Sequence, residues 1–259
     1  ILEAAGDFIT ARLTDNLAAI TSSGSDHFSA QVNRPDTGAL VTLTDYSVAA
    51  DNLTVFVGAR TLSGELGFGG PNAYSASGSS AFIKTVSERG QGSPTSGSAA
   101  TEFAPWGGQI TFSSNATWYF DNDLSTTESF SGNDFYSIAL HELAHVLGVG
   151  TSASWQNKIV NGNFTGAAAV AVYGGAVPLS DSGHWLSGTQ STVMGVPQEA
   201  AMDPEITVGS RKVLTKLDFA GLQDIGWQVT PVPVPSAVWL FGSALLGFLG
   251  LKRKNRISA

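Results

Sequence analysis

The side chains best suited to chemistry lie within one segment of five residues, His141-Glu142-Leu143-Ala144-His145. On a helix, His141 and His145 lie one turn apart on the same face, so both imidazoles can bind one zinc ion. Glu142 lies beside them but too near along the chain to be an easy third ligand. Its expected role is that of a general base, which takes a proton from a zinc-bound water and gives it to a leaving amine.

The residues around this motif predict a helix over residues 133–147 with two different faces. The face opposite the histidines is wholly apolar on a helical wheel and holds Ala139, Leu140, Leu143, Val146 and Leu147. Asn133 or Asp134 can cap the start, and Gly148 stands where a helix stop needs a left-handed residue. Such a helix packs its back in the core and holds a metal over a cleft. A chance motif on a solvated helix would lack the apolar face.

The third metal ligand must come from elsewhere, because a catalytic zinc usually takes three protein ligands and leaves one position for water. The sequence has four histidines, so a third imidazole belongs to His27 or His184. His27 lies in a polar stretch typical of a protein surface, whereas His184 lies downstream in Asp181-Ser-Gly-His184-Trp185. We favour His184 over His27, an aspartate or a glutamate.

The segment from His141 to Gly148 resembles the HExxHxxG core of metzincin metalloproteases. In the standard form of that family a third histidine follows the glycine by three residues, and here that position is Thr151. A neutral hydroxyl is a poor zinc ligand, so the standard form does not apply. The leishmanolysin-like branch inserts a long segment before its third histidine, and the placement of His184 looks like that arrangement. The resemblance implies zinc ligands at His141, His145 and His184, with Glu142 as the base.

Metzincins also place a methionine in a tight turn beneath the metal, and this chain has only Met194 and Met202. Met202 precedes Asp203-Pro204, which is a turn signal, so Met202 is preferred to Met194. The segment from Leu217 to Trp227 resembles the closing helix of such domains. Its apolar positions predict a helix over residues 214–224.

Two stretches upstream of the motif, residues 108–113 and 118–120, have the composition of strands. They resemble the segments before the zinc helix in matrixins, in which an edge strand pairs with the extended substrate. By the same analogy Asp121 and Asp123 could bind calcium, but we favour a solvated loop at these positions.

The rest of the body gives weaker patterns. Apolar residues at near-helical spacing predict a helix over residues 3–20, and a short β-rich run predicts a buried strand over residues 53–57. Residues 62–101 are dominated by glycine, serine, asparagine and proline, which indicates long surface loops.

Composition limits the class of protein. The 259 residues include no cysteine, which excludes disulfides, thiolate metal sites and a cysteine-based latency switch. The formal net charge is -8, but four basic residues fall in the last eight positions. Residues 1–251 therefore hold 9 basic and 21 acidic residues, a net charge of -12. Such a body repels phosphate backbones, so we expect no nucleic-acid partner.

The C-terminal region has a separate character. Prolines at 231, 233 and 235 indicate an extended linker, and residues 236–251 form an uncharged run that is followed at once by Lys252-Arg-Lys. This order predicts a membrane-directed segment with its basic end in the cytoplasm. The tail resembles a PEP-CTERM sorting signal, with Pro233-Val-Pro in place of the usual Pro-Glu-Pro. The resemblance implies an exosortase-type processing machinery in a Gram-negative bacterium and delivery to the envelope or outside the cell.

These features predict three parts. The first is an α+β metzincin-like catalytic domain over residues 1–229, with a twisted mixed sheet, an active-site helix and a C-terminal helix. A proline-rich linker over 230–235 and a transmembrane sorting helix over 236–259 follow. The expected activity is that of a secreted zinc-dependent endopeptidase acting on proteins or peptides. The alternatives are a zinc-binding surface or matrix protein without significant protease activity, and a structural envelope protein with a chance motif.

Overall fold

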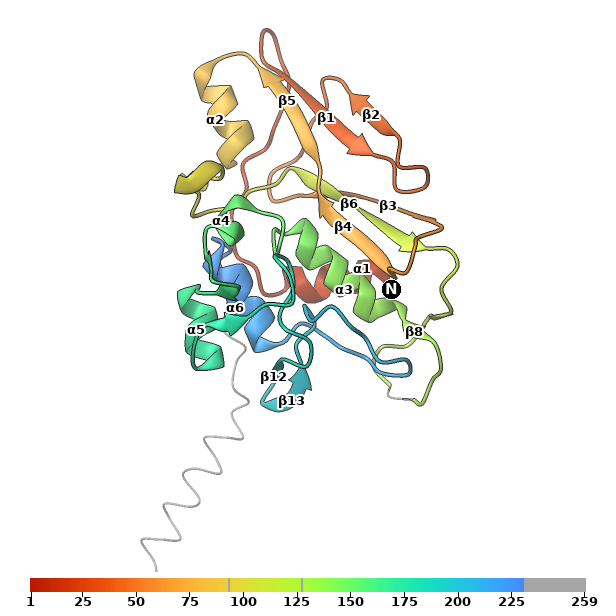
Figure 1. Cartoon of the computed structure of the whole chain (residues 1–259). Helices are drawn as coiled ribbons and strands as arrows, with labels where there is room; N and C mark the ends of the chain where they lie inside the picture. The colour runs from red at the N-terminus through yellow and green to blue at the C-terminus, as the bar shows by residue number, and fades with distance from the viewer. Residues whose placement is uncertain (93, 127, 231–259) are drawn as a thin grey trace, which may run out of the picture.

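The helix that carries the motif, α3 (Phe135–Val146), lies at the centre of the molecule (Figure 1). The computed structural model of the protein describes residues 1–92, 94–126 and 128–230. Asp134 is the N-cap of α3, because its carboxylate accepts a hydrogen bond from the Ser137 N–H. Gly148 has a φ of 105°, the left-handed conformation that ends a helix. The predicted helix over residues 133–147 is therefore confirmed with slightly shorter bounds.

A mixed sheet of three strands packs against α3. Its strands, in spatial order, are β3 (Thr54–Arg60), β6 (Gly107–Ser113) and β4 (Gly67–Pro71). β3 runs parallel to β6, and β4 runs antiparallel to it. All seven residues of β6 are buried, and Ile110 and Phe112 join the main core beside α3. The strands predicted over residues 53–57 and 108–113 are thus present, but β3 lies at the edge of the sheet and is half-buried instead of buried.

A second small layer lies on the far side of this sheet from α3, at the top of Figure 1. Its elements are β1 (His27–Asn33), β2 (Leu40–Leu43), β5 (Ala73–Ser77) and α2 (Ser80–Glu88). The short helix η1 (Gly97–Ala99) follows along the chain and contacts residues 153–156 instead. The strand order is β2-β1-β5, and the separate core of this layer surrounds Trp106. The Trp106 indole N–H donates to the carbonyls of Asn72 and Ala73, which ties the layer to the end of β4.

The loops predicted over residues 62–101 are a wrong prediction, since β4, β5, α2 and η1 all lie there. Glycine and serine have low strand propensity, but strand formation depends on what a segment packs against. β4 is glycine-rich because it passes very close to α3. Tertiary packing, rather than local pattern, makes this segment a strand.

Two further helices complete the main core. α1 (Leu2–Thr10) packs against α3, and α6 (Lys216–Asp224) begins with a capping box made by Thr215 and Asp218. α6 confirms the predicted C-terminal helix. α1 is shorter than predicted, because the chain after Thr10 is drawn into backbone bridges that pair Leu13 with Val229 and Ile20 with Val48.

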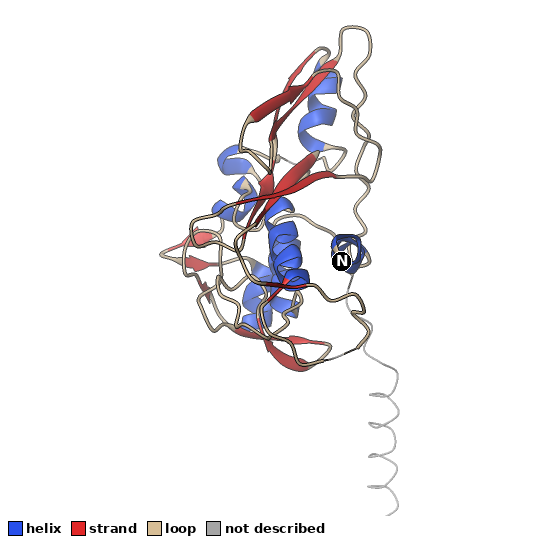
Figure 2. Cartoon of the chain, turned by 90° about the vertical axis from the view of Figure 1, so that its right-hand side faces the viewer, coloured by secondary structure: helices blue, strands red, loops and turns tan. Residues whose placement is uncertain are grey.

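The remaining elements are short and surround the lower half of the molecule (Figure 2). They are β7 (Trp118–Tyr119), β8 (Asn133–Asp134), α4 (Ala153–Gln156), β9 (Ile159–Val160), β10 (Asn163–Phe164), α5 (Ala167–Tyr173), β11 (Val177–Pro178), β12 (Gln190–Val193) and β13 (Val196–Glu199). The α+β class is confirmed. Within the described part of the chain, no helix combines the length and apolar character needed to cross a membrane. Residues 231–259, with most of the predicted linker and the whole sorting tail, lie outside the described residues.

Candidate metal centre

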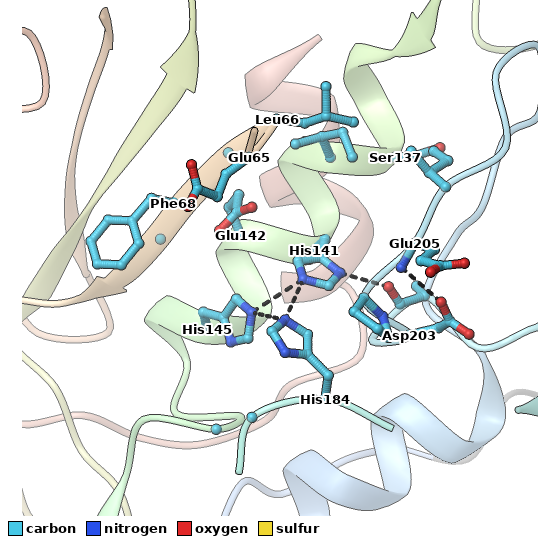
Figure 3. A pocket seen from close by; sticks show the side chains of 18 of the residues that line it. Glu65, Leu66, Phe68, Ser137, His141, Glu142, His145, His184, Asp203 and Glu205 are labelled. Atoms are coloured by element: carbon cyan, nitrogen blue, oxygen red, sulfur yellow. Dashed lines mark hydrogen bonds between the residues drawn. The ribbon is translucent and has the colours of Figure 1, made fainter. Parts of the chain in front are cut away.

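Three imidazoles meet at one point on the open face of α3 (Figure 3). The Nε2 atom of His145 lies 3.1 Å from Nε2 of His141 and 3.1 Å from Nε2 of His184. The remaining pair, His141 and His184, is 3.2 Å apart. His141 and His145 come from successive turns of α3, and His184 comes from the loop between β11 and β12. Among the described residues this is the one group of three metal-ligating side chains.

His27 does not join this group. It lies at the start of β1, where its Nδ1 atom lies 2.6 Å from the carboxylate of Asp45 on the surface. The structure thus brings together the three histidines that the sequence favoured and leaves His27 apart.

Each imidazole of the group is held from its far side by an acceptor. Nδ1 of His141 lies 2.7 Å from the Ala201 carbonyl oxygen, and Nδ1 of His145 lies 2.8 Å from that of Val149. A carbonyl oxygen only accepts, so both Nδ1 atoms carry the proton. Nδ1 of His184 lies 2.9 Å from the Asp181 carboxylate.

The protonation and spacing of these rings fit a metal ion at their centre. Burial lowers the pKa of His141 well below its usual value and that of His145 to about 4, so both rings stay neutral. Neutral rings with protonated Nδ1 atoms turn Nε2 lone pairs toward one another, and lone pairs alone repel. Ligand nitrogens of a tetrahedral zinc, at about 2.0–2.1 Å from the metal, are about 3.3–3.4 Å apart. The observed spacing of 3.1–3.2 Å is close to that arrangement.

Glu142 lies beside the histidines, beneath β4 (Figure 3). Its side chain is buried, with 5% of the residue exposed, and its Oε2 atom has no hydrogen-bond partner among the described residues. Burial raises the pKa of this carboxyl to about 8, against a smaller lowering by the backbone of Gly69. A bound dication would favour the ionised form instead. The carboxyl is thus placed to exchange a proton in the cleft, and no structural contact occupies Oε2.

The cleft around these groups has a volume of about 660 Å³. Its walls come from the loop and strand around β4, from the outer face of α3, and from the segments around His184 and Asp203. This volume is in the range of small-ligand sites.

β4 forms the upper rim of the cleft and has a free edge. The Leu66 carbonyl accepts from the Ser113 N–H, and the Asn72 N–H donates to the Gly107 carbonyl, both toward β6. Peptide groups alternate along an antiparallel strand, so those of Gly67 and Gly69 point to the free edge. The strand that can pair with an extended substrate is therefore β4, in the segment predicted as loop. Residues 108–113 form the central strand β6, which has a neighbour on each side.

Gly69 passes so close to α3 that a Cβ atom there would collide with the backbone carbonyl oxygen and Cβ of Glu142. We expect Gly69→Ala to lower the free energy of unfolding by about 2 kcal/mol, because neither backbone can yield without shifting β4 from the helix. Gly70→Ala is the matched control. Its Cβ would meet nothing nearer than a methyl group of Thr151 at 4.0 Å. Urea unfolding of both variants tests this, and equal stability of the two would contradict it.

Asp181 fixes the orientation of His184, the single ligand candidate that lies on a loop. We expect Asp181→Asn to weaken zinc affinity about tenfold, since an outer partner orients a metal-binding imidazole and raises its basicity. The matched control is Asp45→Asn, which removes the carboxylate beside the surface imidazole of His27. Competition with a chromophoric chelator measures both. A loss of affinity as large in Asp45→Asn as in Asp181→Asn would refute this role.

Thr151 occupies the position of the third histidine in standard metzincins, and its hydroxyl is engaged elsewhere. Oγ1 donates to the carbonyl oxygen of His145 at 2.7 Å, and the same carbonyl accepts from the Gly148 N–H at the end of α3. Thr151 thus shapes the helix end and the cleft wall.

The two methionines lie in very different places. Met194 is 66% exposed at the tip of the β12–β13 hairpin, whereas Met202 is fully buried in the main core. The Met202 carbonyl accepts from the N–H of Trp185, the residue after His184, and the preceding Ala201 carbonyl holds His141. The backbone around Met202 thus contacts both the His141 side chain of α3 and the loop that carries His184.

Sequence reasoning missed Asp218. This fully buried carboxylate accepts from the N–H groups of Ala201 and Met202 and from the Trp185 indole. It also accepts from Thr215 at the start of α6. The motif Thr215-Lys-Leu-Asp218 is a recognisable capping box, but its contacts with the metal centre depend on the tertiary fold.

The calcium hypothesis receives no support. The Asp121 carboxylate pairs with Arg211 at 2.8 Å and accepts the N–H of Asp123. Asp123 in turn accepts hydrogen bonds from Ser125. These carboxylates hold the loop to Arg211, which also forms two hydrogen bonds to Asp134 at the start of α3. The charge of Asp121 is thus engaged by Arg211, and Oδ1 of Asp123 is engaged by Ser125.

Comparison with known families agrees with this chemistry. Residues 84–192 match the family model of matrixin, of the M10 peptidases. The match spans α3 and His184, so the histidine triad and the family similarity together indicate a zinc metallopeptidase. No curated protein and no solved structure matches the chain. The leishmanolysin-like variant and the sorting signal are not supported by these comparisons.

Proposed function

We propose that the protein is a secreted zinc-dependent endopeptidase. The observation that carries this proposal is the convergence of three Nε2 atoms beside Glu142, whose Oε2 atom has no hydrogen-bond partner among the described residues, in a cleft with a free strand edge. The similarity of residues 84–192 to matrixins supports the same activity.

His141, His145 and His184 would hold the zinc, which polarises the scissile carbonyl and the attacking water when bound. An extended peptide would pair with the free edge of β4, so that its scissile bond lies over α3. Glu142 would accept the proton of the attacking water at Oε2. It would then deliver that proton to the nitrogen of the leaving amine, so that the C–N bond breaks to give a neutral amine and a carboxylic acid, and the acid then releases the second water proton to solvent.

Metal removal tests the proposal. We expect casein hydrolysis to fall to background after chelation and to return with one equivalent of zinc, because without the cation the histidines offer nothing that activates water. Metal analysis of the purified protein should give one zinc per chain. Stoichiometric zinc with no turnover on casein or a peptide library would overturn the protease and favour a zinc-binding surface protein. Absence of stoichiometric zinc would favour a structural protein with a chance motif.

We also propose delivery to the envelope or exterior of a Gram-negative cell, with exosortase-type processing of residues 236–259. The support is the sequence alone, an uncharged run of 16 residues followed by Lys252-Arg-Lys. Cell fractionation of the full chain and of a chain ending at residue 230 tests this. Equal distribution of the two proteins would contradict it.

A further inference from the structure

The walls of the cleft beside the histidines carry two exposed carboxylates, those of Glu65 and Glu205. Apart from the histidines, the charged residues that line it are Glu65, Glu142, Asp203, Glu205 and Lys212. Glu65 and Glu205 are both exposed and lie on different walls, one next to β4 and the other on the segment after Met202 (Figure 3). Their carboxylates face the solvent that a substrate would displace.

The single lysine does not offset these charges. Lys212 is buried, and its Nζ atom lies 2.6 Å from a carboxylate oxygen of Glu199 and 3.7 Å from one of Asp203. The same ammonium group donates to the backbone carbonyl of Glu205 at 2.5 Å. Its charge is neutralised within the protein, so it cannot attract an acidic substrate.

The arm of the cleft toward the start of α3 combines apolar walls with an acidic rim. Ile138 and Ile206 line it, and Glu205 lies next to Ile206. The Glu205 carboxylate accepts one hydrogen bond from the Ser187 hydroxyl and remains exposed. Lysine and arginine side chains have an apolar stem and a cationic end, which matches this order of surfaces.

We propose that the cleft selects cationic peptides, with a lysine or arginine next to the scissile bond held by Glu205 and Glu65. This inference rests on the proposed peptidase function and names its substrate class. The net charge of -12 over residues 1–251 acts in the same direction at longer range, because it raises the local concentration of cationic chains. Glu65 and Glu205 are thus specificity-determining residues of the site.

The test uses peptides that differ only in Lys, Leu or Glu at the residues flanking the scissile bond. We expect kcat/KM to be about tenfold higher for Lys than for Glu, mainly through KM. Raising the salt concentration to 0.5 M should reduce this ratio to roughly twofold. Zinc-loaded Glu142→Gln protein gives a second readout. In fluorescence anisotropy it should bind the Lys peptide more tightly than the Glu peptide, without cleaving either.

Charge reversal identifies the residues. The double variant Glu65→Lys, Glu205→Lys should invert the preference, whereas Glu3→Lys, an exposed site on α1 outside the cleft, should leave it unchanged. Cleavage of Lys and Glu peptides at equal rates would overturn this inference and leave the peptidase standing. If no peptide is cleaved, the proposed function fails. The inference about charge is then tested by anisotropy alone, and equal affinity for the Lys and Glu peptides overturns it.

Discussion

Replacing Glu142 with glutamine should lower kcat by about 10³-fold while the protein keeps its zinc. General acid–base catalysis contributes roughly 10²–10⁴-fold, and an amide can neither accept the proton of the attacking water nor pass it to the amine. The substitution keeps the shape of a buried side chain. It also breaks no hydrogen bond of Oε2, which has no partner among the described residues. Stability should therefore change little.

The measurement combines casein or peptide turnover with metal analysis and thermal unfolding. Glu88→Gln on α2 is a matched control, since it removes a half-buried carboxylate outside the cleft. It should leave turnover and zinc content unchanged. If Glu142→Gln retained zinc and cleaved casein at the rate of the unmodified protein, Glu142 would not be the base.

The same residue should set the acid limb of the pH profile. A base works only when it is deprotonated, so kcat/KM should rise with pH through the pKa of Glu142. Burial raises that pKa to about 8 in the protein alone, and the zinc dication opposes the shift. The limb should therefore lie between the usual glutamate value and pH 8. The residual activity of the Glu142→Gln variant should show no such acid limb.

Local sequence patterns determine the half of the site that lies on one helix. His141, His145, the apolar back of α3 and the stop at Gly148 all follow from helical periodicity within a single segment. His184 followed from a different circumstance, because only four histidines were available and Thr151 could not serve. A chain with more histidines would have left the third position open.

The other half of the site depends on contacts between distant segments. The glycine-rich composition of β4 indicates a loop when taken alone, and only the close passage over Glu142 explains why glycines form a strand there. The extended course after Thr10 depends likewise on pairing with residues 48 and 229. Asp121 illustrates the converse error, since the acidic loop looked free until Arg211, 90 positions later, was seen to pair with it. No pattern along the chain records such partners.

Asp218 is the second residue whose replacement should have a large effect. We expect Asp218→Asn to lower the free energy of unfolding by about 3 kcal/mol and zinc affinity about tenfold or more. Both carboxylate oxygens accept hydrogen bonds, Oδ2 from Ala201 and Thr215, and Oδ1 from Met202 and Trp185. Asparagine has one acceptor oxygen, so its amino group would face buried N–H donors with which it cannot pair.

The effect on zinc affinity follows because the N–H donors bound by Asp218 belong to the segments that hold His141 and His184. The Ala201 peptide carries the carbonyl that holds Nδ1 of His141, and Trp185 adjoins His184. Loosening this network should let both imidazoles move while His145, held by Val149 within its own helix end, stays in place. Two of three ligands then lose their orientation. Unfolding by urea and competition with a chromophoric chelator measure the two consequences separately.

The matched control lies six residues along the same helix. Asp224 accepts hydrogen bonds from the N–H groups of Ala168 and Ala169 and so caps α5, away from the histidines. Asp224→Asn should cost about 1 kcal/mol of stability and leave zinc affinity unchanged. If Asp218→Asn lost stability but bound zinc as tightly as the Asp224 variant, Asp218 would support the core without positioning the metal ligands. A loss of zinc affinity confined to Asp218→Asn would show that Asp218 both supports the core and positions the metal ligands. If lower stability alone weakened zinc binding, each variant would lose affinity in proportion to its loss of stability.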